Sequence, residues 1–181
     1  MDPLEVIKKF YNPNSKAFII LVNHSKAVAE KAIKISEKFN LDKQFIYEAA
    51  ILHDIGIFMT YTPKFDCYGN YPYIAHGYLG RELLQKEGLP KHALVCERHT
   101  GVGITKEEIV TKKLPLPPRD MIPISLEEKI IAYADKFFSK ESDGSVKVNT
   151  VDSIIKELSR YGEEKVKTFA EWVEMFEGTA L

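Results

Sequence analysis

The sequence lacks several features that would point to particular classes of protein. Its 181 residues include two cysteines, Cys67 and Cys96, which are too few for a disulfide framework. Lysine and arginine number 25 against 26 aspartate and glutamate residues, so no basic excess draws the chain to nucleic acid. No apolar run approaches the roughly 20 residues that span a bilayer. We therefore expect neither a nucleic-acid partner nor membrane contact.

The remaining composition is that of an ordinary globular protein. Apolar residues make up 45% of the chain and charged residues 28%. A chain of this length has the size of one domain with a substantial core. The segment Met1–Glu5 is acidic and lacks the basic start of a signal peptide. We expect a single cytoplasmic domain that spans residues 1–181.

Helical periodicity covers most of the chain, and no segment shows a convincing strand pattern. Asp42 has the character of a helix N-cap, and the pairs Thr105/Glu108 and Ser125/Glu128 have the spacing of capping boxes. We expect helices in nine places: a short one from Pro3, a long one from Asn12-Pro13 to about Lys38, one from Asp42 to near Gly56, one over 76–87, one from Pro90 through His99, a short one after Thr105, one after Ser125 through Asp135, and two over 150–160 and 162–177.

Three segments interrupt this pattern. Residues 60–73 are rich in Tyr, Pro, Gly and Asn and predict a loop. Residues 113–124 contain four prolines and cannot form a helix. Residues 140–149 predict a polar turn. The expected fold is therefore all-α, a helical bundle of about seven to nine helices.

Six residues of metal-binding type lie on the apolar faces of these helices. Histidine and carboxylate together are the ligands of hydrolytic metal sites. A lone buried histidine is more often a hydrogen-bonded core residue, but buried aspartates need a cation or donors because an unpaired buried charge costs several kcal/mol. We therefore predict one shared metal site in the centre of the bundle, with these ligands: His24, His53, Asp54, His76, His99 and Asp135.

His24, His53-Asp54 and Asp135 form a motif that resembles that of the HD-domain metal-dependent phosphohydrolase superfamily. Residues 53–56 carry its His-Asp-Ile-Gly variant. The resemblance covers roughly residues 15–140, and we expect the helices within 150–177 to pack on this core. It implies the HD-domain bundle as the fold.

Two further histidines, His76 and His99, match the extra ligands of the dinuclear members of this superfamily. The segment His99-Thr100-Gly101 is similar to small stand-alone members, including a group that hydrolyses dinucleoside tetraphosphates. No Gly-Tyr-Pro signature follows His99, which disfavours the cyclic-di-GMP branch. The resemblance thus implies one or two divalent transition metals, Fe, Mn, Zn or Ni, with dinuclear Fe or Mn favoured.

The activity that this resemblance implies is metal-dependent hydrolysis (EC 3.1 or 3.6). The expected substrate is a small phosphoester or phosphoanhydride, in our interpretation a nucleotide, attacked by metal-bound hydroxide. Asp54 is the first catalytic candidate because it is placed to bridge both ions. Lys136, directly after a ligand, is a candidate for catalysis and for phosphate binding, and a solvated helix position is the alternative reading.

Four more residues are candidates for substrate binding. Thr100 and Gly101 follow a ligand and could offer a hydroxyl and a backbone N–H to phosphate. Arg98 precedes the same ligand, although we favour a surface ion pair at this position. Tyr68, in the aromatic loop, could stack on a nucleobase or merely pack on the domain.

Two other functions stay open at this point. A minority of the superfamily are di-iron oxygenases, and a catalytically idle nucleotide-binding module would also retain the fold. The presence of all six ligands argues against the idle module, because degenerate members are expected to lose some. The sequence leaves open whether the protein forms a homodimer.

Overall fold

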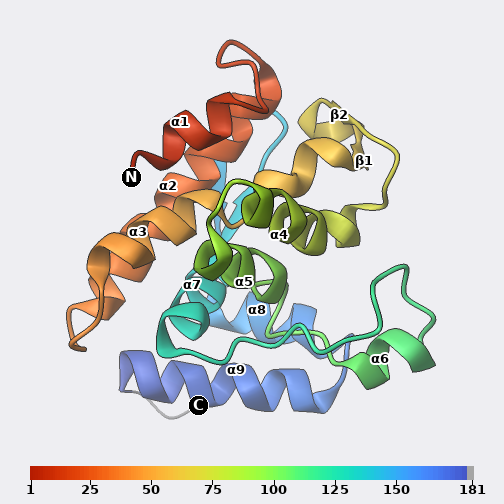
Figure 1. Cartoon of the computed structure of the whole chain (residues 1–181). Coiled ribbons are helices and arrows are strands. Elements are labelled where there is room, and N and C mark those ends of the chain that lie inside the picture. Colours follow the sequence, from red (N-terminus) through yellow and green to blue (C-terminus); the bar gives the residue numbers. More distant parts are fainter. Residues whose placement is uncertain (179–181) are drawn as a thin grey trace.

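The computed structural model describes residues 1–178, and the predicted all-α bundle is confirmed (Figure 1). No helix within these residues is long and apolar enough to cross a membrane. Their α-helices are α1 (Pro3–Lys8), α2 (Lys16–Ser36), α3 (Lys43–Leu52), α4 (His76–Lys86), α5 (Pro90–Arg98), α6 (Lys106–Thr111), α7 (Leu126–Lys136), α8 (Val151–Leu158) and α9 (Glu163–Glu177). Three short 3-10 helices are η1 (Ile55–Met59), η2 (Pro63–Phe65) and η3 (Tyr73–Ala75).

Side-chain caps begin six of the described α-helices, and two details of these caps differ from the prediction. Helix α2 begins after Ser15 rather than at Asn12-Pro13, because the Ser15 hydroxyl accepts the Phe18 N–H at 3.1 Å. Ser125 caps α7, but its predicted capping box is incomplete. The Glu128 carboxylate accepts the Ile124 N–H at 2.7 Å instead of reaching back to the cap residue.

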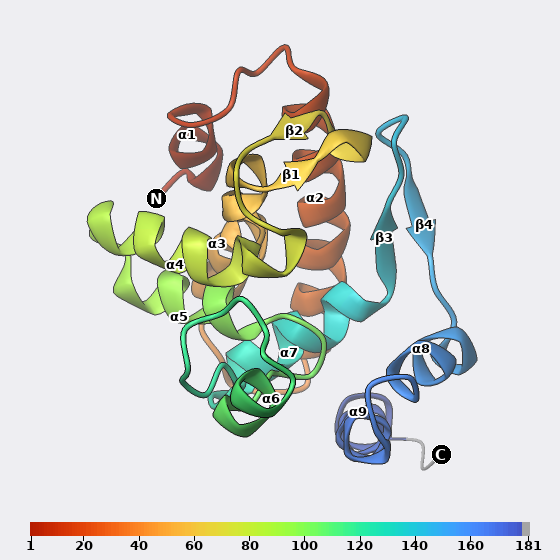
Figure 2. The same cartoon turned by 90° about the vertical axis from the view of Figure 1, so that its right-hand side faces the viewer.

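Two small antiparallel hairpins replace segments that were predicted as loop or turn. Strands β1 (Tyr61–Thr62) and β2 (Cys67–Tyr68) lie within the aromatic loop. Strands β3 (Phe138–Lys140) and β4 (Val146–Val148) follow α7 and pack beside α2 (Figure 2). The sequence did not reveal these strands, because strands of two or three residues are too short to show a period of two.

The core lies between α2, α3, α5 and α7, and the C-terminal helices close it from one side. Tyr133 of α7 is fully buried, and its ring stacks on Phe169 of α9 with centroids 5.5 Å apart. Trp172 and Phe176 of α9 are also buried in this cluster. Helix α9 runs along one edge of the bundle in Figure 1, where it covers the core as expected for the helices within 150–177.

The 3-10 helix η1 crosses α4 at a distance that leaves no room for a side chain. A Cβ on Gly56 would lie 2.2 Å from the His76 carbonyl oxygen and 2.6 Å from the Gly80 nitrogen. A Cβ on Gly80 would lie 2.3 Å from the Cys96 sulfur. This crossing holds the peptide after Asp54 directly against the first turn of α4.

We expect Gly56→Ala to destabilise the fold by about 3 kcal/mol, because backbone atoms on both sides must move to admit one methyl group. Gly88→Ala is the matched control. Gly88 has φ +76°, and a methyl group there would have no atom within 4 Å, so the strain of about 1–2 kcal/mol is purely local. Urea unfolding monitored by circular dichroism measures both. Equal midpoints for the two variants would show that the crossing imposes no constraint.

Candidate metal centre

The six predicted ligands come from distant parts of the chain and lie together in the structure: His24 in the middle of α2, His53 and Asp54 after the end of α3, His76 at the start of α4, His99 after the end of α5, and Asp135 near the end of α7. One local detail differs from the prediction. Helix α3 ends at Leu52, so His53 and Asp54 occupy the turn into η1 rather than one helical face.

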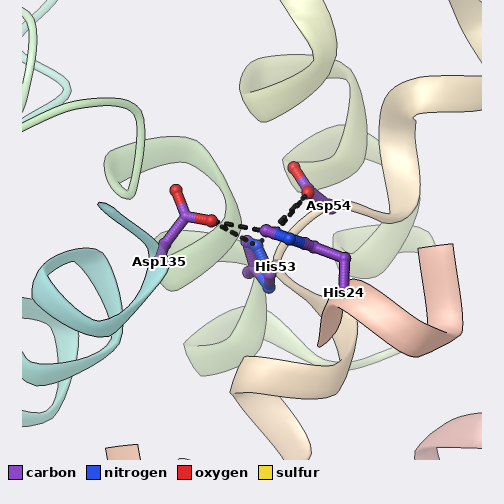
Figure 3. Close-up of side chains that lie close together, drawn as sticks. All are labelled: His24, His53, Asp54 and Asp135. Atoms are coloured by element: carbon purple, nitrogen blue, oxygen red, sulfur yellow. Dashed lines mark hydrogen bonds and ion pairs between the residues drawn. The ribbon is translucent and has the colours of Figure 1, made fainter. Parts of the chain in front are cut away.

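Four of these residues form a first group, in which the ligand atoms all lie within 4.8 Å of one another. His24 Nε2 is 2.9 Å from Asp135 Oδ1 and 3.4 Å from Asp54 Oδ2. His53 Nε2 is 3.3 Å from Asp54 Oδ2 and 3.4 Å from Asp135 Oδ1. Figure 3 shows these four side chains pointing toward one shared space, with a carboxylate on either side.

Asp54, His76 and His99 form a second group. Asp54 Oδ1 is 3.2 Å from His76 Nε2 and 3.3 Å from His99 Nε2. The other oxygen of the same carboxylate, Oδ2, faces the first group. One aspartate therefore stands between two ligand sets, which is the arrangement that a bridging carboxylate requires.

Three of the histidines are oriented by the same backbone contact. Nδ1 of His53, His76 and His99 lies 2.6, 2.6 and 2.7 Å from the carbonyl oxygen three residues earlier in the chain. Because a carbonyl can only accept, each Nδ1 carries the proton and donates it. In its neutral form each ring then presents a free lone pair at Nε2, the atom that faces the cluster.

This donor and acceptor pattern fits bound cations. His76 Nε2 and His99 Nε2 are 3.1 Å apart, although both are acceptors when the rings are neutral. Within residues 1–178, neither oxygen of Asp54 nor Nε2 of His53 takes part in a hydrogen bond, although Asp54 Oδ2 forms an ion pair with the Lys140 ammonium at 2.5 Å. Buried acceptors that face one another are costly without a positive charge between them. Imidazole and carboxylate ligands suit Fe, Mn, Zn or Ni.

The electrostatics of the cluster keep its carboxylates ionised. Burial opposes the charge of Asp54, but Lys140 and His53 outweigh it and hold the pKa well below its usual range. The hydrogen bond from His24 and the neighbouring His53 ring likewise overcome burial and hold the pKa of Asp135 well below normal. Burial lowers the pKa of His53, yet Asp54 and Asp135 together raise it to about 10. Burial and the charge of Lys140 lower the pKa of His24 to about 4. Both aspartates are therefore in the form that binds metal.

A cavity of about 710 Å³ opens beside the cluster. Asp54 and the two histidines of the second group line one end of it. Thr100, Gly101 and Lys136, three of the predicted substrate contacts, also line this cavity. The ammonium of Lys136, however, lies 3.0 Å from the Glu157 carboxylate rather than against the metal cluster.

The other two predicted substrate contacts lie elsewhere. Arg98 forms an ion pair with Glu128 at 3.0 Å, which is the alternative reading of its position, and is not part of the cavity wall. Tyr68 also lies off the cavity. Its side chain on β2 is 66% exposed, and its ring packs edge-on against Tyr61. The expected contacts of Arg98 and Tyr68 with substrate are therefore not supported by their positions.

Sequence reasoning missed two residues at the cluster. Lys140 of β3 places its ammonium 2.5 Å from Asp54 Oδ2. Tyr73 stacks its ring on His76 with centroids 4.7 Å apart, and its hydroxyl lies 3.4 Å from the Lys140 ammonium. The sequence places Lys140 in a polar turn, and no pattern distinguishes it from other lysines. Tyr73 is one of several aromatic residues in the 60–73 loop, and nothing in the sequence separates it from the others.

Two residues near the ligands have structural roles. The Cys96 thiol donates to the His53 carbonyl oxygen at 2.9 Å, and burial raises its pKa well above normal, so its environment does not favour a thiolate ligand. The fifth histidine, His92, lies outside both groups, with Nε2 3.2 Å from a Glu48 carboxylate oxygen.

Comparison with known proteins gives consistent matches. A family model described as "HD domain" matches residues 21–139. An uncharacterised protein of Methanocaldococcus jannaschii is 34% identical over 163 residues, which are 87% of this chain and 82% of that protein. The crystal structure of the HD domain of the L. monocytogenes phosphodiesterase PgpH has the same fold, with a TM-score of 0.53, 16% identity and 98% of each chain covered.

Two longer proteins also match. The tRNA (cytidine(56)-2'-O)-methyltransferases of Thermoplasma volcanium and Picrophilus torridus are 38% and 34% identical over 120 and 123 residues. These matches cover 66% and 67% of this chain but only 32% of each methyltransferase. The chain thus corresponds to about a third of the length of these two relatives.

We expect the purified protein to bind two divalent ions, one for each ligand group. His76→Ala should remove the ion of the second group and keep that of the first, and His24→Ala should do the reverse. His92→Ala is the control and should keep both, because His92 lies outside the cluster. Elemental analysis by mass spectrometry measures the stoichiometry. Loss of both ions in His76→Ala, or of either in His92→Ala, would contradict this assignment.

Proposed function

This chain belongs to the HD-domain family, and from that membership and its ligand cluster we propose that it is a metal-dependent phosphohydrolase. Its substrate in this proposal is a phosphoester or phosphoanhydride of a nucleotide. The observation that carries the proposal is the cluster of six ligands in two groups at the end of a lysine-rich cavity.

The ligand groups define what each residue would do. His24, His53 and Asp135 would hold one ion, His76 and His99 the other, and Asp54 would contribute one oxygen to each. Divalent cations held there lower the pKa of water toward neutrality and stabilise negative charge on phosphate oxygens. No nucleophilic side chain is needed.

The charge of the cavity supports an anionic substrate. Apart from the metal ligands, its wall contains two glutamates, Glu108 and Glu157, and five lysines. In a chain of net charge −1, this local excess attracts anions to the site. The lysines are Lys64, Lys112, Lys136, Lys140 and Lys165.

The size and lining of the cavity support a nucleotide rather than free phosphate. Its volume of about 710 Å³ falls within the range of pockets for small organic ligands. Phe65, Ile104 and Phe138 contribute apolar surface on which a base could pack. Thr100 and Gly101, next to His99, are our candidates for phosphate contacts at the rim. Lys136 is held by Glu157, and we assign it an outer, substrate-binding position.

The name of one structural neighbour supports the coarser part of this proposal. A phosphodiesterase cleaves phosphate esters. Because this chain matches only about a third of each methyltransferase, methyl transfer itself is not proposed for it.

We expect Asp54→Asn to lower turnover by more than about 10³-fold, because it removes charge from both ion sites at once. Lys136→Ala should have a smaller effect, mainly on KM. Hydrolysis of a panel of nucleotides and phosphate esters with Mn²⁺, Fe²⁺ or Ni²⁺ measures this, and ¹⁸O-labelled water should deliver its oxygen to the phosphate product. His92→Ala, outside the cluster, should turn over at the wild-type rate.

Three outcomes would contradict this proposal. Wild-type turnover in Asp54→Asn would mean that a contaminant causes the activity. Tight nucleotide binding without hydrolysis under any metal would favour the idle binding module. Oxygen consumption with a diol substrate would favour a di-iron oxygenase.

A further inference from the structure

The Lys140 ammonium has an unusual position for a lysine. Its side chain is only 9% exposed, and its Nζ lies 2.5 Å from Asp54 Oδ2. The same oxygen faces Nε2 of His24 and of His53, at 3.4 and 3.3 Å. Lys140 therefore contacts the atom through which Asp54 would serve the first ion.

An ammonium and a metal ion compete for this oxygen. A buried carboxylate needs a positive partner, and Lys140 supplies one. A divalent ion among His24, His53 and Asp135 would supply the same charge more strongly and would repel the ammonium at this separation. The ammonium and the divalent ion therefore cannot both interact strongly with Asp54 Oδ2.

The ammonium of Lys140 has an alternative position within the cavity. Its side chain lines the cavity, where Tyr73 offers a hydroxyl 3.4 Å from Nζ. Lysine has a flexible four-carbon stem, so Nζ can move several ångströms while strand β3 stays fixed. The wall around it also contains Asp54, His76 and His99, so a phosphate at the ligand cluster would lie within its reach.

We propose that Lys140 exchanges partners: it neutralises Asp54 when the first group holds no cation, and it turns into the cavity to bind the substrate phosphate when a cation is present. The phosphate half rests on the proposed function, whereas the competition with metal does not. Lys136, the lysine expected from the sequence, lies farther out on Glu157, and Lys140 takes the role next to the reacting phosphate.

The alternative is that Lys140 only fastens the β3–β4 hairpin to the bundle. The hairpin packs against α2, and the ion pair with Asp54 ties it to the turn after α3. A fastening role predicts that loss of the ammonium loosens the site, so metal and phosphate would both bind more weakly. Partner exchange predicts opposite changes in the two affinities.

The decisive variant is Lys140→Met, which keeps the apolar stem and removes the charge. Its affinity for Mn²⁺, measured by isothermal titration without substrate, should rise by about tenfold because the competing charge is gone. Lys147→Met, on β4 of the same hairpin and exposed, should leave the affinity for Mn²⁺ unchanged. Weaker Mn²⁺ binding in Lys140→Met would overturn the proposal in favour of fastening.

The second measurement is the binding of inorganic phosphate to the Mn²⁺-loaded protein. Lys140→Met should bind it about tenfold more weakly, since one charge-assisted hydrogen bond is lost. Lys147→Met should match the wild type, and Lys140→Arg should return both affinities toward the wild-type values. Unchanged phosphate affinity in Lys140→Met, or no phosphate binding by the loaded wild type, would overturn the phosphate half.

These two binding measurements separate this inference from the proposed function. If Mn²⁺ binds more tightly and phosphate more weakly in Lys140→Met, partner exchange stands even when the wild type hydrolyses no ester. In that case the phosphohydrolase proposal alone fails. Circular dichroism of each variant in urea ensures that the compared proteins are folded.

Discussion

The shared carboxylate of Asp54 is the contact on which the rest of the site depends. Its two oxygens face different ligand sets, and both are buried. A charge in this position is stable only with positive partners on each side, so the fold must bring α2, α4, α5, α7 and β3 to one point. The bundle is organised around this requirement, because a residue in or directly after each of these elements either contacts Asp54 or is its neighbour Asp135.

The orientation of the histidines comes from helix ends rather than from long-range contacts. His53, His76 and His99 are the residues that end α3, η3 and α5. Each ring donates Nδ1–H to the carbonyl three residues earlier, in the helix that it ends. One local contact thus fixes the tautomer that leaves Nε2 free. The crossing of Gly56 and Gly80 then sets the distance between two of these ends.

The sequence predicted which residues gather at the site and where several helices begin. It did not predict the directions in which neighbouring side chains point. The six predicted ligands lie together as expected, and the helix starts capped by Asp42 and Thr105 were predicted correctly. Arg98 was chosen only because it precedes a ligand. Adjacent side chains on a helix point about 100° apart, so Arg98 reaches Glu128 instead of the cavity. Lys140 could not be found, since it enters the site from a three-residue strand without a detectable period.

The predicted metal ligands and part of the cavity wall come from different segments of the chain. The family match over residues 21–139 contains all six ligands but ends one residue before Lys140. Asn149, Tyr161 and Lys165, which also line the cavity, lie beyond it. In the proposed function, the family match therefore supplies the predicted ligands and most of the cavity wall, and the hairpin and C-terminal helices complete that wall. Changes at Asn149, Tyr161 or Lys165 can reshape the cavity without touching Asp54, whereas a change at Lys140 alters the cavity and the central carboxylate together.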